Sequence, residues 1–328
     1  MYKTRISGTG SYLPEKRLTN KDLEKMMDTS DEWIFERTGI RARAVAASNQ
    51  GTSDLAFEAS KRALEMANLK ATDIDMIIFG TVTPDQVMPS AACFLQKKLG
   101  CRNVMAFDLN AACTGFLYGL AIADQFIRTG TYKNILVVGA EVLTRKLNYE
   151  DRETCILFGD AAGAVIASRA PEGENSEILS QHLYAEGNLA DLLEWPAGGT
   201  SIPITHEVLD QGLHWMKMKG RDIFKNAVRS MGHACGEALR SSGLKTEQID
   251  WVIAHQANLR IIEAVAKNAN MPMDKFILFI EEMGNTSAAT IPCTLDYAVR
   301  KNQVQRGQHL LLTAFGAGLT SGSILLRY

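Results

Sequence analysis

The 328-residue sequence lacks any apolar run long enough to cross a membrane. A spanning helix needs about 20 consecutive apolar residues, and Met1–Ile6 are not followed by the apolar stretch of a signal peptide. The six cysteines form no Cys-x-x-Cys pair, which argues against a zinc ribbon, an iron–sulfur cluster and a dense disulfide framework. We therefore expect no membrane association, no metal site and a reduced, cytoplasmic setting.

Strong charge is also missing. The net charge is −2, and there is no arginine-rich or aromatic-basic stripe, so nothing indicates a nucleic-acid partner. Hydrophobic residues make up 46% of the chain and charged residues 22%, as in ordinary globular proteins. At this length the chain can form two domains, or one large domain, with a sizeable core.

Cys113 occupies the most informative position in the sequence. Residues 103–109 predict a short buried strand, and the apolar residues of 114–129 recur at helical spacing before Gly130, a typical helix stop. Cys113 therefore lies at a turn from strand to helix, among small neighbours that let a substrate approach. The start of a helix carries unpaired N–H groups and partial positive charge, which favours a thiolate and can bind a developing anion. The alternative is a cysteine that only packs, as most free cysteines do.

The sequence also repeats itself at an offset of 175 residues. Residues 63–78 match residues 238–253, and both copies predict the end of an amphipathic helix, a loop and a buried strand. A second strand, a small-residue turn and another helix follow in each half, between 107 and 113 in one and between 279 and 285 in the other. Strands that alternate with helices predict an α/β fold with largely parallel, buried sheets covered by helices.

The repeat divides the chain into an N-terminal half, 1–172, and a C-terminal half, 173–328, which meet in a polar, turn-forming segment. Two such halves facing one another would bring Cys113 and Asn285 to equivalent places near a pseudo-twofold axis. Residues 188–216 have no counterpart in the first half, and their Gly, Pro and Trp residues are typical of an insertion that shapes a pocket or an interface.

Two further polar residues lie where such a fold would place a site. His255 follows the predicted buried strand 251–254, and open α/β folds carry their chemistry at that edge of the sheet. Asn285 lies at another turn into a helix. A lone histidine is more often structural, and Asn285 could be only a helix N-cap. Together with Cys113, however, they supply a nucleophile and two neutral hydrogen-bonding groups, a set suited to chemistry on a thioester.

Several ordered segments resemble β-ketoacyl-acyl-carrier-protein synthase III, a condensing enzyme with the thiolase fold. The likeness runs essentially from end to end. The segments that carry it are Ser30–Ile40, Ala111–Phe116, Phe158–Ala164, His255–Asn258, Gly284–Ala289 and Ala314–Thr320. The resemblance implies the thiolase-like, five-layered αβαβα architecture with an internal duplication, in agreement with the repeat.

The same resemblance implies a two-stage Claisen condensation. Cys113 would attack a short acyl-CoA primer and form an acyl-enzyme, while the backbone N–H groups of Cys113 and Ala317 hold the oxyanion. Malonyl-acyl-carrier protein would then lose CO₂, and His255, through Nε2–H, and the Asn285 amide would stabilise the enolate. The product is a 3-oxoacyl-acyl-carrier protein. No metal or other cofactor is expected, because acyl-CoA is a substrate.

Binding residues are also implied by the resemblance. Trp33 and Arg152 would stack on either side of the CoA adenine, with Arg37 on the phosphates, which suits an indole and planar guanidinium groups.

Other implied residues serve macromolecular partners. Arg260, Lys225 and Lys267 would receive the acidic carrier protein, although Asn268 stands where a second lysine is common. In a homodimer, Met88 would reach across the interface and close the acyl pocket. A flexible methionine there leaves the primer length open, with acetyl as the default and longer or branched primers as options.

Three alternatives stay open at this point. A related Cys-His-Asn condensing enzyme of the polyketide or alkylquinolone type would share the same three residues. A papain-like cysteine hydrolase also uses Cys, His and Asn, but in a cleft between unlike lobes. A non-catalytic relative could bind acyl groups without reacting.

Overall fold

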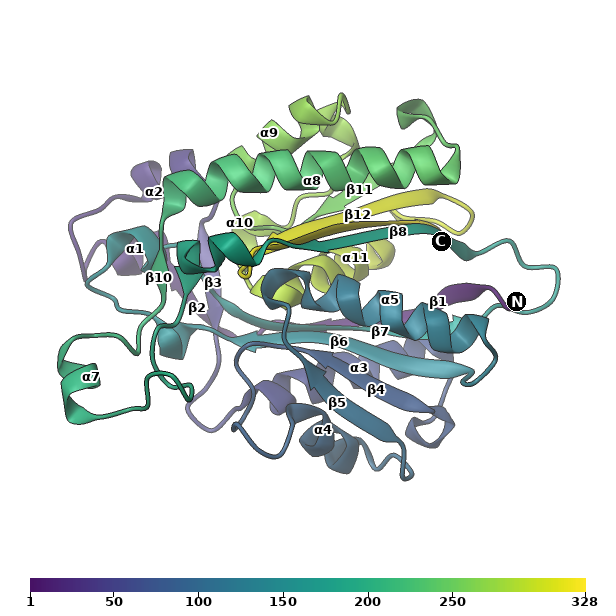
Figure 1. Ribbon diagram of the computed structural model, residues 1–328, viewed down its shortest axis with the longest axis horizontal. Coiled ribbons are helices and arrows are strands. Elements are labelled where there is room, and N and C mark those ends of the chain that lie inside the picture. The colour runs from purple at the N-terminus through teal and green to yellow at the C-terminus, as the bar shows by residue number, and fades with distance from the viewer.

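Two β-sheets carry the fold, and helices lie outside and between them (Figure 1). The computed structural model describes all residues from 1 to 328. The first sheet has the order β1-β7-β6-β4-β5, and the second has the order β11-β12-β13-β8. The strands of the first sheet are β1 (Thr4–Tyr12), β4 (Met76–Gly80), β5 (Met105–Leu109), β6 (Asn134–Val142) and β7 (Asp160–Arg169). Those of the second are β8 (Glu177–Ala185), β11 (Trp251–Ala254), β12 (His309–Gly316) and β13 (Thr320–Arg327).

The helices complete a five-layered arrangement. α3 (Thr52–Ala67) and α4 (Ala91–Leu99) share an apolar cluster with the outer face of the first sheet. α5 (Gly115–Arg128) and α11 (Thr290–Arg300) lie between the sheets and share the largest cluster with both. α8 (Gly220–Ser242) and α9 (Leu259–Asn268) cover the second sheet. The order of layers is therefore αβαβα, which confirms the predicted architecture.

The sheets are mixed rather than largely parallel. β4 pairs in parallel with β5 and β6, and β11 pairs in parallel with β12, but the other four pairings are antiparallel. Antiparallel neighbours need only a short connection, whereas parallel ones need a crossover. β12 and β13 are separated by three residues, 317–319, so this hairpin cannot be parallel.

The internal repeat is visible in the structure at the predicted offset. α3 and α8 end at Ala67 and Ser242, and each helix is followed by a residue with left-handed backbone, Asn68 (φ 52°) and Gly243 (φ 71°). β6 and β12 likewise begin 175 residues apart, at Asn134 and His309.

One feature of the predicted repeat is wrong. Where the second half was expected to contain another strand before Asn285, it has the short helix α10 (Ile280–Met283) and a single bridge between Val252 and Phe276. Cys113 and Asn285 are consequently not equivalent by the repeat. Two 3-10 turns, Ala112–Thr114 and Ser287–Ala289, correspond at the offset of 175, so the counterpart of Cys113 is Ala288.

The strand before Cys113 is also less buried than predicted. β5 is the edge of its sheet, paired only with β4, so one side has no neighbour. Its first residue, Met105, is 46% exposed, and the others are half-buried.

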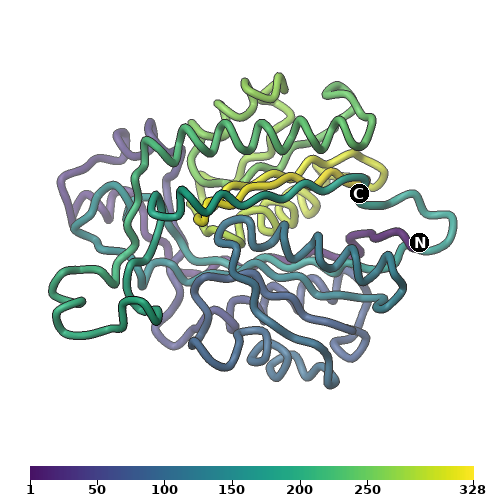
Figure 2. Tube along the Cα trace, viewed as in Figure 1, coloured from purple at the N-terminus to yellow at the C-terminus, as the bar shows by residue number.

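The remaining elements belong to two excursions, residues 13–51 and 186–219, and to short helices. In Figure 2 both excursions lie on the left side of the molecule, toward which the start of α5 points in Figure 1. They contain β2 (Lys16–Thr19), α1 (Asn20–Leu23), α2 (Asp31–Thr38), β3 (Ala42–Val45), β9 (Leu193–Glu194), α7 (His206–Asp210) and β10 (Lys217–Met218). The short helix α6 (Arg152–Cys155) lies between β6 and β7.

All strands of the first sheet precede residue 170 and all strands of the second follow residue 176. The two halves nevertheless share a core, because α11 of the second half packs on β1 and β7 of the first. We propose that the division into 1–172 and 173–328 marks the repeat and not two independently folding units. No helix has the length and apolarity to span a bilayer.

Candidate active site

Cys113 lies at the turn from β5 into α5, as the sequence predicts. The residue before it, Ala112, has a left-handed backbone (φ 46°), a strained state for a residue with a side chain. The hydroxyls of Thr114 and Thr320 hold this turn, because they donate to the Ala111 carbonyl at 2.6 and 3.1 Å. The turn thus presents Cys113 in one fixed orientation.

Burial governs the acidity of Cys113. The residue is 7% exposed. Mainly through this desolvation, the pKa of the thiol is raised to about 12; a hydrogen bond with Ser287 opposes the shift and nearby Glu141 adds to it. The expectation that the helix start favours a thiolate is therefore wrong for the unliganded protein. The partial charge of a helix end is worth roughly 1 kcal/mol, which is less than the cost of a buried anion.

His255 directly follows β11, and its N–H donates to the Thr313 carbonyl on β12 at 2.8 Å. The ring is buried, and its Nδ1 lies 2.6 Å from the Thr290 hydroxyl. Burial lowers the pKa of His255 to about 3. The imidazole is therefore neutral at physiological pH and can serve as a hydrogen-bonding group.

Both the backbone and the side chain of Asn285 make hydrogen bonds that hold the residue in place. Its N–H donates to the Leu157 carbonyl at 2.9 Å, and its carbonyl accepts from the Gly159 N–H at 3.0 Å. Its Oδ1 accepts from the Ser287 N–H at 2.9 Å, in the manner of a cap. The cap-like bond uses the oxygen only, so the Nδ2 donors are left for another partner.

One cavity joins the three predicted residues. Cys113, His255 and Asn285 all line a cavity of about 380 Å³, together with the residues from α2 and α6 described below. A second cavity of about 420 Å³ also reaches Cys113 and is lined by Ala317 of the β12–β13 loop. Cys113 therefore stands where two cavities meet.

The backbone beside Cys113 is built for close approach. A methyl group on Gly316 would lie 2.7 Å from the Cys113 nitrogen, so only glycine fits there. Neither the Cys113 N–H nor the Ala317 N–H donates to a protein group. Cys113 and Ala317 both line the second cavity, so these two N–H groups are candidates for an oxyanion hole there.

Trp33, Arg37 and Arg152 all line the 380 Å³ cavity. The guanidinium carbons of Arg37 and Arg152 lie 4.4 and 4.6 Å from the Trp33 ring centroid, and Arg152 donates to the Asp28 carbonyl at 2.6 Å. A base stacked between Trp33 and Arg152 would need about 7 Å, two van der Waals contacts. Arg152 must therefore move before an adenine can lie between them.

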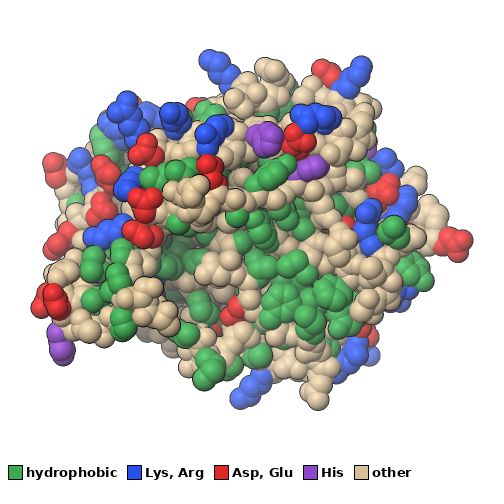
Figure 3. All heavy atoms as spheres, in the orientation of Figure 1, with side chains coloured by type: hydrophobic (Ala, Val, Ile, Leu, Met, Phe, Trp, Pro, Cys, Tyr) green, Lys and Arg blue, Asp and Glu red, His purple; other side chains and the backbone are tan.

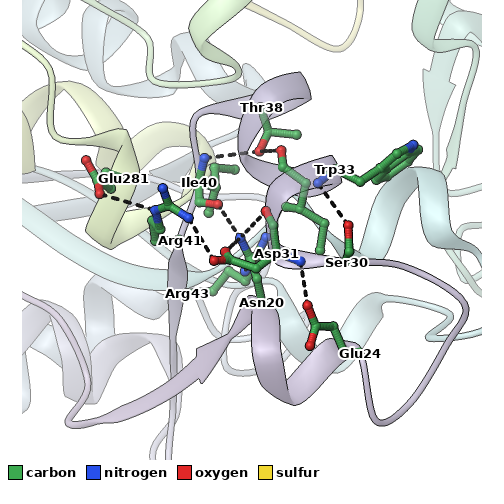
Figure 4. Close-up of polar contacts among 11 residues, drawn as sticks. Asn20, Glu24, Ser30, Asp31, Trp33, Thr38, Ile40, Arg41, Arg43 and Glu281 are labelled. Carbon is green, nitrogen blue, oxygen red and sulfur yellow. Dashed lines mark hydrogen bonds and ion pairs between the residues drawn. The ribbon is translucent and has the colours of Figure 1, made fainter.

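A polar network that is buried at Asn20 and Arg43 anchors the helix that carries Trp33 (Figure 4). Ser30 caps α2 by accepting from the Trp33 N–H at 3.1 Å. Asn20 donates to Asp31 at 2.8 Å and to the Ile40 carbonyl at 2.7 Å, and it accepts from Arg43 at 2.5 Å.

The fully buried Arg43 extends this network to a second segment. It also donates to the carbonyl of Ile156, directly after α6. The network ties α2 to α6, while Figure 4 shows the Trp33 ring pointing away from it.

The three predicted carrier-protein residues, Arg260, Lys225 and Lys267, are exposed and lie on the paired helices α8 and α9. None lines the cavity, but their neighbours Phe224 and Ile261 do. Arg260 donates to the Glu36 carbonyl at 3.1 Å, so α9 also contacts α2.

Met88 is 84% exposed and its neighbour Val87 is 96% exposed. Neither lines either of the two cavities at Cys113. Figure 3 shows hydrophobic side chains gathered on the viewer's face over the α5 and β5 region, and a hollow beside the loop that carries α7.

Sequence reasoning missed several residues around the two cavities. Leu193, Trp195, Met216 and Met218 line them and come from the 188–216 excursion or its edge. Residues 188–216 were predicted to shape a pocket. Because the first half of the chain has no matching segment, the sequence did not show which of these residues would line it. The mouth residue Arg221 gave no signal, because it reads as a solvated charge on a helix.

Glu141, the last residue but one of β6, was also missed. It is fully buried and accepts from the N–H groups of Val82 and Thr83 at 3.1 Å and from the Thr81 hydroxyl at 3.1 Å. Burial raises the pKa of Glu141 to about 7, against the opposing effect of these bonds. No group of three or more His, Cys, Asp or Glu side chains is arranged to hold a metal ion.

Comparison with known proteins gives consistent results. A family described as 3-oxoacyl-acyl-carrier-protein synthase III matches residues 107–187, and the C-terminal model of that synthase matches residues 239–328. The chain is 53% identical over 325 residues to β-ketoacyl-acyl-carrier-protein synthase III of Xanthomonas axonopodis pv. citri, covering 99% of this chain and 98% of that one. It is 52% identical over 323 residues to the same enzyme of Caldanaerobacter subterraneus subsp. tengcongensis, covering 98% and 97%.

Solved structures are similar in the same way. 3-Oxoacyl-acyl-carrier-protein synthase III from Aquifex aeolicus VF5 has a TM-score of 0.92 and 47% identity, covering 99% of this chain and 100% of that one. The priming β-ketosynthase of the R1128 polyketide pathway has a TM-score of 0.91 and 31% identity, covering 99% and 96%.

Proposed function

The chain belongs to the β-ketoacyl-acyl-carrier-protein synthase III family, and we propose from this premise how its own residues carry the reaction. As a member, it is an acyl-transferring condensing enzyme that starts fatty acid synthesis. We propose that it takes a short acyl group from CoA, acetyl by default, and joins it to malonyl-acyl-carrier protein. The thiolase-like fold removes the support for a papain-like hydrolase, which needs two unlike lobes.

In the first stage, Cys113 Sγ forms a bond to the acyl carbon and the bond to the CoA sulfur breaks. The thiol proton leaves with the CoA thiol. The tetrahedral intermediate carries a negative oxygen, and the free N–H groups of Cys113 and Ala317 are the donors we assign to it. Two cavities meet at Cys113, which supports an assignment of one to the acyl chain and the other to the pantetheine arm of CoA.

In the second stage, malonyl-acyl-carrier protein loses CO₂ and its thioester becomes an enolate. We assign the enolate oxygen to His255 Nε2–H and Asn285 Nδ2, because both groups are neutral and both line the cavity with Cys113. A carboxylate in either place would repel the enolate. The enolate carbon then attacks the acyl carbon on Cys113, and the bond to Sγ breaks with its electron pair on sulfur. Sγ takes up a proton from solvent, which restores the thiol, and the 3-oxoacyl product leaves.

For binding, we assign Trp33 and Arg152 to the adenine and Arg37 to the phosphates, with Arg152 leaving the Trp33 face as the nucleotide enters. The mechanism needs no cofactor. Arg260, Lys225 and Lys267 are assigned to the carrier protein, on the support of their exposure beside the cavity-lining residues of α8 and α9.

We propose a homodimer that forms through the edge strand β5 and the exposed segment around Met88. Met105, Val87 and Met88 are large apolar side chains that lie open to water, and an edge strand with unpaired backbone groups is a template for another strand. In such a dimer Met88 would enter the partner's acyl pocket. The six free cysteines support a reduced, cytoplasmic location.

The observation that carries the proposal is that one cavity is lined by the thiol, the imidazole and the amide together, and by Trp33 and Arg152 as well. A specific observation keeps a second candidate open. The three heavy atoms of an acetyl group fill only a small part of the 420 Å³ cavity of one chain, into which the proposed dimer would insert Met88. A longer, branched or aromatic primer, as in polyketide or alkylquinolone pathways, is therefore the alternative.

The test is the mass of the intact protein after incubation with acetyl-CoA, longer and branched acyl-CoAs, or anthraniloyl-CoA. The expected result is an added acyl mass that is absent from Cys113→Ala, followed by a 3-oxoacyl product when malonyl-acyl-carrier protein is supplied. Preferential labelling by anthraniloyl-CoA would replace the fatty acid assignment by the alkylquinolone type. Release of free acid without condensation, or no labelling at all, would refute the proposal.

A further inference from the structure

Thr290 is the only hydrogen-bonding partner of the His255 Nδ1 atom. The residue begins α11 and is fully buried, and its Oγ1 lies 2.6 Å from Nδ1. Burial alone accounts for the low pKa of His255, with no charged neighbour contributing. No carboxylate therefore fixes the ring, and its orientation and protonation depend on one hydroxyl.

The hydroxyl of Thr290 has two neighbours and one proton. Besides Nδ1, it lies 3.0 Å from the Ser287 carbonyl, which can only accept. If the hydroxyl donates to Ser287, then Nδ1 must carry the ring proton and Nε2 is a bare acceptor. If the hydroxyl donates to Nδ1, the ring proton lies on Nε2. The rotation of one hydroxyl thus selects the tautomer of His255.

The Ser287 carbonyl can release the hydroxyl at little cost, because it also accepts from the backbone N–H of Thr290. Nδ1 has no such second partner. When the hydroxyl turns to Nδ1, both atoms stay satisfied, and the 2.6 Å contact becomes a donor bond to the ring.

We propose that Thr290 is a positioning residue that holds His255 in the tautomer with its proton on Nε2. This inference rests on the proposed function, because only that tautomer offers a donor to the enolate formed from malonyl-acyl-carrier protein. Thr290 touches no substrate in this assignment and acts through the imidazole. The attack of Cys113 on acyl-CoA uses backbone donors instead, so the two half-reactions should differ in their need for Thr290.

The experiment compares Thr290→Val, which keeps the shape and removes the hydroxyl, with Thr290→Ser, which keeps the hydroxyl. Cys113 acylation is followed by intact mass, and condensation by product formation from enzyme already acylated. We expect Val to slow condensation about 100-fold, the scale of one lost transition-state donor, and to change acylation less than about threefold. Ser should restore most of the condensation rate.

Nitrogen-15 NMR of histidine-labelled protein, with His255→Ala for assignment, reports the tautomer directly. We expect the proton on Nε2 in the wild type and the Ser variant, and a mixture of tautomers in the Val variant. A wild-type ring protonated on Nδ1 would overturn the inference, and so would equal condensation in the Val variant. Equal losses in Val and Ser would also overturn it, since they would indicate packing.

The proposed function fails on a different result. If wild-type protein is neither acylated nor able to condense, the function itself is wrong. If the wild type performs both steps and Val does as well, only the role of Thr290 is wrong.

Discussion

The oxyanion assignment makes a sharp prediction for Gly316→Ala. The added methyl would lie 2.7 Å from the Cys113 nitrogen and 3.2 Å from the Cys113 Cβ. An ordinary contact begins at 3.4 Å, so the turn that carries the Cys113 N–H must retreat by about 0.7 Å or the methyl must cover it. Either change removes a backbone donor from the position that we assign to the oxyanion.

The size of the effect follows from two separate terms. Loss of one preorganised oxyanion donor costs about 3 kcal/mol, or roughly 100- to 1,000-fold in rate. Overpacking of a buried position costs about 1–3 kcal/mol of folding free energy. We therefore expect folded Gly316→Ala to acylate Cys113 at least about 100-fold more slowly, with a modest loss of thermal stability.

Gly8→Ala is the matched control. Its methyl would lie 2.2 Å from the Ala63 carbonyl oxygen and 2.7 Å from the Ala67 nitrogen, between β1 and α3 in the outer layer. The assay is the rate of acyl mass gain from acyl-CoA, with circular dichroism and thermal unfolding for each variant. Gly8→Ala should lose stability and keep the acylation rate. Wild-type acylation by Gly316→Ala, or an equal loss in Gly8→Ala, would refute the oxyanion assignment.

Three other predictions concern acidity, docking and assembly. The pKa of Glu141 is raised from 4.5 to about 7, so its contribution to the stability of the fold is complete below pH 4.5 and is lost as pH rises through 7. Glu141→Gln should remove a pH dependence of up to about 3 kcal/mol from the free energy of denaturant unfolding. An unchanged dependence of this free energy on pH would contradict the shift. Arg260→Glu should lower turnover with malonyl-acyl-carrier protein about tenfold and leave turnover with malonyl-CoA unchanged, because the reversed charge repels only the acidic carrier. Equal losses of turnover with both donors would exclude a role of Arg260 in docking the carrier protein. Met105→Lys should produce monomers in sedimentation experiments, because a charge on an edge strand blocks strand addition, and an unchanged mass would place the interface elsewhere.

Much of the fold could be predicted from local pattern. The repeat offset of 175 residues located α3 and α8, and the helix after Cys113 begins where its apolar spacing begins. The second strand predicted near Phe279 failed because the repeat has diverged there, into α10 and a single bridge. The matching of Cys113 with Asn285 failed for the same reason, since the equivalent turns are Ala112–Thr114 and Ser287–Ala289.

The residues of the site differ in whether a local stretch of sequence identifies them. His255 and Asn285 each follow a recognisable local feature, so their selection needed only short stretches of sequence. Thr290 acts through a residue 35 positions away, and Glu141 through a loop 58 to 60 positions away. Their partners exist only after the sheets are formed. A glutamate in the apolar strand 134–142 is unusual, but the sequence does not show which groups it bonds.

The pKa of Cys113 illustrates why the chemistry needs the whole fold. The helix start, a local feature, favours a thiolate, but the β12–β13 loop and the central layer bury the sulfur and raise its pKa to about 12. The same burial keeps His255 neutral. Burial therefore acts against both a thiolate on Cys113 and an imidazolium on His255. In the proposed mechanism each intermediate carries its negative charge on oxygen before a sulfur leaving group departs. The tetrahedral oxygen lies beside the backbone donors of Cys113 and Ala317, and the enolate oxygen lies beside His255 and Asn285, so the donors lie where these charges form.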